Sequence, residues 1–357
     1  MKRGALIAFS FGLALFIGIL VWQGASAVLQ ALEVAGWGML VVAAWHIVPL
    51  LFDSVGQWCA LPAHERRLPR FITVLRSRWI GEGVNSLLPV AQVGGLIVMV
   101  RVLAQRGYPN AQAGAGVTVG TTQQMLAQAA FAIVGVALLG HLSDDPHLFW
   151  GLIAGIAVFL AICAWGYRAQ RHGLFERLAR ILEKTFKGSD WLKLTGGAQA
   201  LDAAVHETYK RRRRVVASFL SYFAGWIVGM GESWLALYFL DHRVGWLDAL
   251  FLESLSQTIY AMAFAIPGAL GVQEGGYVLL CGLIGVPADT AIAVSLIKRV
   301  RQLSLGLPAL VSWQWFESRK LKRVARAAAH PELTADATPV SRATPVSSSP
   351  ARPSRDS

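Results

Sequence analysis

Charged residues are scarce in this chain, and their scarcity argues against an ordinary soluble protein. Of the 357 residues, 15% are Asp, Glu, Lys or Arg, whereas roughly 25% is typical of soluble domains. Apolar residues make up 55% of the chain, and several apolar runs approach the roughly 20 residues that a membrane-spanning helix needs. The composition therefore predicts an all-α polytopic membrane protein.

Cysteines are few, and recognisable catalytic motifs are lacking. Cys59, Cys163 and Cys281 lie in or beside apolar runs, without metal-ligand or disulfide spacing. No serine occupies a nucleophile elbow, and neither a phosphate-binding loop nor an HExxH motif occurs. We therefore predict a protein that is not an enzyme and that uses no metal or other cofactor. Asp144-Asp145 beside His147 leaves a metal-assisted transferase open, although an acidic exterior loop is the simpler interpretation.

The formal net charge of +12 suits membrane topology better than nucleic-acid binding. Six candidate full spans are 5–22, 38–59, 115–139, 149–167, 215–239 and 289–313. Lys and Arg gather before the first span, after the second, in residues 168–214 and after the last, while the other loops hold at most one. By the positive-inside rule, both termini are cytoplasmic. We predict a multi-pass protein of the bacterial inner (plasma) membrane with no nucleic-acid partner.

Two polar segments, broken by proline and glycine, occupy matching places in the two halves, at 85–95 and 266–276. Unpaired backbone groups are costly in hydrocarbon, so such breaks persist where they line an enclosed or watery cavity. We expect two re-entrant helical hairpins, about 71–101 entering from the cytoplasm and about 249–286 from outside. Opposite entry sides make the halves an inverted repeat, although two short full crossings are an alternative for the second hairpin.

Such a matched pair predicts a transport site where the two repeats meet. Ionisable side chains within the spans support it, because a charge at mid-bilayer costs at least about 2.5–3.5 kcal/mol and requires a partner or a function. The predicted substrate-binding residues, expected to line a cavity for an anionic headgroup, are Asn85, Pro89, Gln92, Gly94, Gly95, Glu232, Glu253, Gln257, Pro267, Gly271, Gln273, Glu274 and Arg299. For any one of them, a buried and satisfied helix contact is the plainer alternative.

Spacing also predicts particular partners for some of these charges. His46 and Asp53 are seven residues apart and share a helix face, as a secondary polar pair. Arg78 and Glu82, four residues apart, are expected to form an ion pair within one helix. Arg299 is expected to pair with Glu274.

The remaining regions lie outside the predicted spans. Residues 1–316 are predicted to form the transmembrane domain, and 317–357 a basic and then disordered cytoplasmic tail. Within the basic loop 168–214, apolar residues at helical spacing suit either a helix on an anionic lipid surface or a solvated charged loop. The N-terminus also resembles a signal peptide, so cleavage of the first span is left open.

The second-half motif is similar to a known family. Residues 266–276, Leu283-Ile-Gly285 and Lys298-Arg299-Val-Arg301 resemble the membrane region of lysylphosphatidylglycerol synthase and its stand-alone flippase-like relatives. A further resemblance, to the branch associated with hopanoid biosynthesis (HpnL), rests on Leu201-Asp202, Tyr209, Arg211–Arg214, Trp226 and Glu232. The resemblance covers about residues 5–316 and implies movement of a hopanoid or other polar lipid between leaflets.

The sequence departs from this family at two places. Many relatives carry an acidic residue near Gly95 and a Glu-Arg pair in the following span, whereas this chain has Gly95-Leu96 and Thr121-Thr122-Gln123-Gln124. The aminoacyl-transferase domain of the synthase is absent, so lysyl transfer is not implied.

We therefore predict a lipid flippase or transporter, with a membrane lipid as substrate and anionic lipid bound at the basic loop. The alternative is a scaffold that holds lipid-biosynthesis enzymes through residues 168–214. A membrane-embedded lipid-linked transferase is a third hypothesis. The sequence leaves the oligomeric state open.

Overall fold

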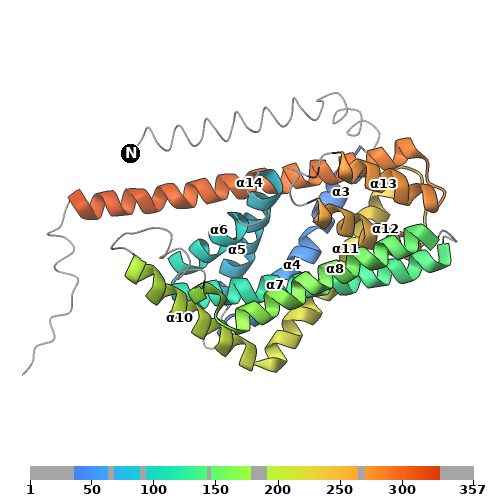
Figure 1. Ribbon diagram of the computed structural model, residues 1–357. Helices are drawn as coiled ribbons and strands as arrows, with labels where there is room; N and C mark the ends of the chain where they lie inside the picture. The colour runs from blue at the N-terminus through green and yellow to red at the C-terminus, as the bar shows by residue number, and fades with distance from the viewer. Residues whose placement is uncertain are drawn as a thin grey trace, which may run out of the picture. The chain divides into compact units, whose positions relative to one another are not determined.

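The computed structural model describes residues 36–62, 68–88, 94–142, 146–177, 191–263, 269 and 271–329. Within these ranges the regular structure is helical and contains no strand (Figure 1). The helices are α3 (Gly38–Trp45), α4 (Ile47–Ala60), α5 (Leu68–Leu87), α6 (Gly94–Gln105), α7 (Asn110–Leu142), α8 (Pro146–Arg171), α10 (Trp191–Lys210), α11 (Arg212–Phe239), α12 (Trp246–Met262), α13 (Val272–Leu283) and α14 (Ala288–Ala329).

Four stretches within the described residues are long and apolar enough to cross a membrane. They are Gly38–Ala60, Asn110–Gly140, Ile153–Arg171 and Arg212–Phe239. They coincide with four of the six predicted spans, and the predicted span 5–22 lies outside the described residues. The predicted span 289–313 is helical within α14 but does not belong to this apolar class, since Lys298, Arg299 and Arg301 fall within it.

Each predicted hairpin contains two helices that pack against each other. α5 packs on α6, and α12 packs on α13 (Figure 1). The breaks between them hold Pro89, Gln92 and Pro267, which lie outside the described residues. The helix–break–helix arrangement is therefore present in both halves, while re-entry from opposite sides of a membrane stays a prediction.

Close backbone approach holds the first helix pair together. The amide N–H of Gly95 donates a hydrogen bond of 2.8 Å to Oδ1 of Asn85, which joins the start of α6 to the end of α5. A Cβ atom at Gly95 would lie 2.3 Å from the carbonyl oxygen of Gly81. Only glycine fits this position, because any other residue would separate the two helices.

The second helix pair uses glycine for its backbone angle. Gly271, at the start of α13, has φ +77°, a value that residues with a Cβ rarely adopt. Its N–H donates a hydrogen bond of 2.7 Å to the Glu274 carboxylate. Glu274 therefore caps the first turn of α13.

The two halves place similar elements in the same order. The first contains α4, the pair α5–α6 and the long helix α7, and the second contains α11, the pair α12–α13 and α14. The two leading helices, α4 and α11, pack against each other. The largest buried apolar cluster joins residues of α3, α7, α8, α11, α12, α13 and α14.

Part of the predicted basic loop is folded onto the bundle. α10 packs on α7 and α8, and the Tyr209 hydroxyl donates a hydrogen bond of 2.9 Å to Gln170 Oε1. Asp202 accepts the N–H groups of Phe175 and Glu176 at 3.3 and 2.7 Å, which fixes the chain just after α8. Residues 178–190, which hold most of the predicted surface helix, lie outside the described residues.

The chain divides into two compact units after Ser312. The first unit holds all the residues discussed below. In the second unit the described residues, 313–329, are the C-terminal part of α14. The predicted tail from residue 330 onward lies outside the described residues.

Candidate functional site: a buried charge cluster

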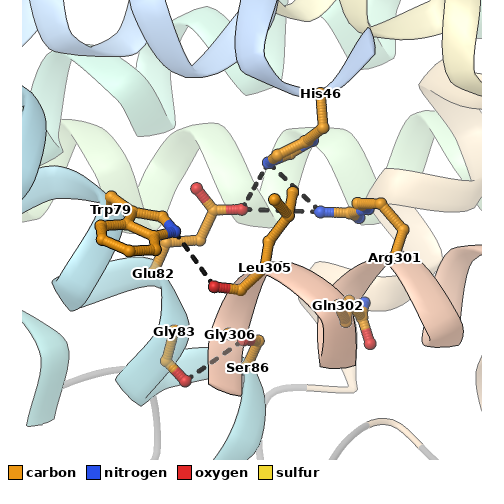
Figure 2. Close-up of a pocket in the computed structure, with 9 residues that line it drawn as sticks. All are labelled: His46, Trp79, Glu82, Gly83, Ser86, Arg301, Gln302, Leu305 and Gly306. Carbon is orange, nitrogen blue, oxygen red and sulfur yellow. Dashed lines mark hydrogen bonds and ion pairs between the residues drawn. The ribbon is translucent and has the colours of Figure 1, made fainter. Parts of the chain in front are cut away.

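His46 stands between two carboxylates from different helices. α3 ends just before it because Pro49 has no N–H to donate to the Trp45 carbonyl. The His46 ring lies with Nε2 2.7 Å from Glu82 Oε1 of α5 (Figure 2), and with Nδ1 hydrogen-bonded to Glu232 Oε1 of α11. One imidazole thus links α4, α5 and α11.

Arg301 of α14 contacts His46, Glu82 and Glu232. Its Nε lies 3.3 Å from Glu232 Oε2, and its Nη1 lies 3.6 Å from Glu82 Oε1. Nη1 also lies 3.2 Å from His46 Nε2. The guanidinium therefore balances part of the negative charge on both carboxylates.

A second buried ion pair continues the cluster through Glu232. Lys298 of α14 lies 3.9 Å from Glu232 Oε2 and forms an ion pair with Glu253 of α12. The Ser233 hydroxyl and the Gln257 amide also donate hydrogen bonds to Glu253, at 2.5 and 2.8 Å. The side chains of Lys298 and Glu253 are only 3% and 4% exposed, so this pair lies fully inside the bundle.

Two further ion pairs flank this core. Arg299 Nη2 lies 2.5 Å from Glu274 Oε1 of α13, as the sequence predicted. Arg78 Nη2 of α5 lies 2.7 Å from Asp53 Oδ2 of α4, which also accepts a hydrogen bond of 3.4 Å from Gln124. We call these two pairs and the core residues His46, Glu82, Glu232, Glu253, Lys298 and Arg301 the charge cluster.

The predicted Arg78–Glu82 ion pair is wrong. Both side chains face α4 rather than each other, so Arg78 binds Asp53 and Glu82 binds His46. The seven-residue spacing on α4 matches the four-residue spacing on α5, which produces two cross-links between these helices. His46 and Asp53 share a face as predicted, but each pairs with α5.

The structure places the other predicted residues in different settings. Gln257 and Gln273 lie within the bundle, where Gln257 donates a hydrogen bond to Glu253 and Gln273 donates one of 3.4 Å to Ser295. Gly94 begins α6. Asn85, Gly95 and Gly271 shape the helix ends described above.

Sequence analysis left Glu82, Lys298 and Arg301 out of the predicted site. The sequence did contain a signal for the two cations: Lys298 and Arg301 are three residues apart and therefore lie on one face of a predicted span, where charges need partners. Glu82 was paired with Arg78 instead, because the sequence does not reveal which helix lies opposite.

The pocket beside His46 is very small. It has a volume of about 10 Å³, which is space for roughly one water molecule. Its lining residues are His46, Trp79, Glu82, Gly83, Ser86, Arg301, Gln302, Leu305 and Gly306 (Figure 2). The Trp79 indole N–H donates a hydrogen bond of 3.0 Å to the Leu305 carbonyl and closes this edge. The predicted headgroup cavity is therefore not open here in this conformation.

A second, wider pocket lies between the end of α8 and α10. It has a volume of about 680 Å³ and is lined by Ala164, Tyr167, Arg168, Arg171, His172 and His206. Arg171 donates a hydrogen bond of 3.2 Å to the Tyr167 hydroxyl. Its lining includes two arginines and two histidines but no carboxylate, so its chemistry suits an anion.

Comparisons with known proteins agree on one family. The sequence profile of a family described as "Lysylphosphatidylglycerol synthase TM region" matches residues 9–309. A UPF0104 membrane protein of Pyrococcus horikoshii is 22% identical over 325 residues, covering 87% of this chain and 95% of the relative. A UPF0104 membrane protein of Methanothermobacter thermautotrophicus is 19% identical over 304 residues, covering 82% and 87%. No solved structure matches the chain.

Proposed function

The chain belongs to the family of the lysylphosphatidylglycerol synthase transmembrane region, and from this premise we propose that it moves a polar lipid between membrane leaflets. It is a membrane protein related to lipid handling. Lipid translocation, rather than chemical modification of the lipid, is the activity that the charge cluster supports best. A hopanoid is one candidate substrate, and the bacterial inner membrane with cytoplasmic termini is the proposed location.

The observation that carries this proposal is the charge cluster itself. Ionisable groups buried among membrane helices are expensive and typically mark a substrate or ion pathway. Here helices from both halves of the chain contribute, since residues at α4 and α5 meet α11 and α14 at His46 and Glu232, and Lys298 of α14 joins Glu253 of α12 to them. A site shared between two repeats is where alternating access places a substrate.

A lipid phosphate can enter this cluster by exchanging with a carboxylate. Arg299 and Arg301 are held in place by Glu274 and Glu82, whose side chains are the more exposed partners at 27% and 32%. Arginine binds phosphate and carboxylate with the same planar set of donors. The headgroup would displace one of these carboxylates while its apolar part stays in lipid, so no buried cation is left unpaired.

Leaflet exchange in proteoliposomes tests this function. Purified protein is reconstituted with labelled phosphatidylglycerol, phosphatidylcholine or a hopanoid, and the label in the outer leaflet is followed with time. We expect protein-dependent exchange that Glu274→Gln slows at least severalfold, because no carboxylate then returns to Arg299 to displace the phosphate and the lipid is released slowly. Glu207→Gln, at an exposed ion pair of α10, is the control and should match the wild type.

Each outcome has a definite meaning. Exchange that Glu274→Gln leaves unchanged would contradict the role assigned to the Arg299–Glu274 pair. Absence of exchange for every lipid, with or without an ion gradient and from folded protein, would contradict the transport proposal. The scaffold hypothesis would then lead, and truncation of the α8–α10 loop should release bound lipid-biosynthesis enzymes.

A further inference from the structure

The short contact between His46 and Glu82 requires a proton between the two side chains. Nε2 of His46 and Oε1 of Glu82 are 2.7 Å apart, which is hydrogen-bond distance. A neutral imidazole has one donor nitrogen, and here Nδ1 already faces Glu232. If Nε2 and Glu82 were both unprotonated, two acceptors would meet at 2.7 Å. One proton must therefore lie on Nε2 or on Glu82.

Charge balance leads to the same conclusion by a separate route. The core of the cluster holds three carboxylates, Glu82, Glu232 and Glu253, and two permanent cations, Lys298 and Arg301. The flanking pairs, Asp53 with Arg78 and Glu274 with Arg299, are neutral by themselves. With one proton on the His46–Glu82 pair beyond the one that a neutral imidazole carries, the core is neutral, and without it the core carries one uncompensated negative charge. Uncompensated buried charge is strongly unfavourable.

The pair also has a path for this proton to leave. The Glu82 side chain is 32% exposed, whereas that of Glu232 is 4% exposed. Both His46 and Glu82 line the pocket that has space for about one water molecule. The proton leaves through the exposed part of the Glu82 carboxyl group, and the pair then holds one positive charge fewer.

We propose that the His46–Glu82 pair is a proton-binding site that couples one proton to each anionic lipid headgroup moved. This inference rests on the transport function proposed above. With the proton on the pair the core is neutral and Glu82 attracts Arg301 less strongly, so that Arg301 is available to a phosphate oxygen. Loss of the proton restores the Glu82 carboxylate, which recaptures Arg301 and expels the phosphate. The anion therefore binds only while the proton is on the pair, and the two leave together.

Lipid distribution under a pH gradient tests the coupling. Wild-type proteoliposomes containing labelled phosphatidylglycerol are given a gradient of one pH unit, and the label in each leaflet is measured at steady state. One proton per lipid biases the leaflet ratio by up to tenfold per pH unit, since tenfold corresponds to about 1.4 kcal/mol. Phosphatidylglycerol without a gradient should distribute evenly.

Glu82→Gln is the decisive variant, because its amide donates permanently to His46 Nε2 and cannot release a proton. We expect it to lose the bias at whatever rate it exchanges lipid, so that the leaflet ratio at steady state stays near one. Glu207→Gln should show the full wild-type bias. A wild-type-like bias in Glu82→Gln, or an unbiased wild type that still exchanges lipid, would overturn the coupling and leave transport standing.

A spectroscopic measurement decides the proton site even if no lipid moves. At neutral pH the full-length protein should show either a doubly protonated His46 by ¹⁵N NMR of histidine-labelled protein or a protonated carboxyl band by infrared spectroscopy. Glu82→Gln should abolish whichever signal is present, and His46→Gln assigns the histidine resonance. Absence of both signals in folded wild-type protein would refute the site.

Discussion

Replacing Lys298 by methionine tests how strongly the charge cluster stabilises the bundle. The side chains of Lys298 and Glu253 are almost completely buried, and removal of one partner from a buried ion pair costs about 3–5 kcal/mol. Ser233 and Gln257 still donate hydrogen bonds to Glu253 in the variant. We therefore expect Lys298→Met to lose about 3 kcal/mol of the free energy of unfolding, at the lower end of that range.

The double variant Lys298→Met/Glu253→Gln separates loss of charge from loss of packing. Both buried charges are then gone, and the glutamine still offers an acceptor to Ser233. Replacement of a whole buried pair by neutral groups is often neutral or stabilising. We expect the double variant to recover at least about 2 kcal/mol relative to Lys298→Met, which is a coupling energy typical of direct contact.

Reversible unfolding in mixed detergent micelles, followed by far-ultraviolet circular dichroism, measures these free energies. The control is the exposed Lys210–Glu207 pair, 3.4 Å apart with side chains 62% and 55% exposed. The same two substitutions there should change stability by less than about 0.5 kcal/mol. If the Lys298 and Glu253 substitutions are additive, or if Lys298→Met behaves like Lys210→Met, the buried pair does not stabilise the fold as argued.

Three further predictions concern packing, lipid binding and pH. Gly95→Ala should lower the free energy of unfolding by about 1–3 kcal/mol, because the new methyl group would lie 2.3 Å from a carbonyl oxygen of α5. Gly275→Ala, with open space around it, is the control and should be neutral or stabilising in the same unfolding assay. Arg168→Gln/Arg171→Gln should retain less phosphatidylglycerol but the same phosphatidylcholine in native mass spectrometry, because these arginines line the basic pocket; equal loss of both lipids would contradict an anion site. Burial raises the pKa of Tyr209, on α10 outside the spans, to about 12, above its unfolded value of about 10. The stability that this shift contributes is therefore complete below about pH 10 and is lost as pH rises through about 12. Ultraviolet titration should detect this late ionisation, and Tyr209→Phe should remove that part of the alkaline destabilisation.

Hydrophobic runs and broken segments predicted the elements of this fold well. The four apolar spans and the two helix pairs were predictable because lipid demands long apolar helices and because proline and glycine interrupt them. The last helix was also predicted as a span, at 289–313, although Lys298, Arg299 and Arg301 are unusual within one. Only carboxylates from neighbouring helices account for their burial.

Partner choice within the site was the part that sequence could not supply. Glu274 and Arg299 were predicted as partners and do bind each other. Arg78 and Glu82 satisfy the spacing for a helical ion pair equally well, yet Arg78 binds Asp53 of α4 and Glu82 binds His46, just before α4. Spacing limits which residues can meet on one helix, but the rotation of that helix toward its neighbours depends on packing of the whole bundle.

Lys298, Arg299 and Arg301 all lie on α14, while the carboxylates that bind them lie on α5, α11, α12 and α13. A separate helix carrying these three cations into hydrocarbon would incur about 8–10 kcal/mol on insertion scales. α14 is also the last helix to leave the ribosome among those described. We infer an order of biogenesis in which the earlier helices associate first and display their carboxylates, and α14 enters the membrane only against that assembled template.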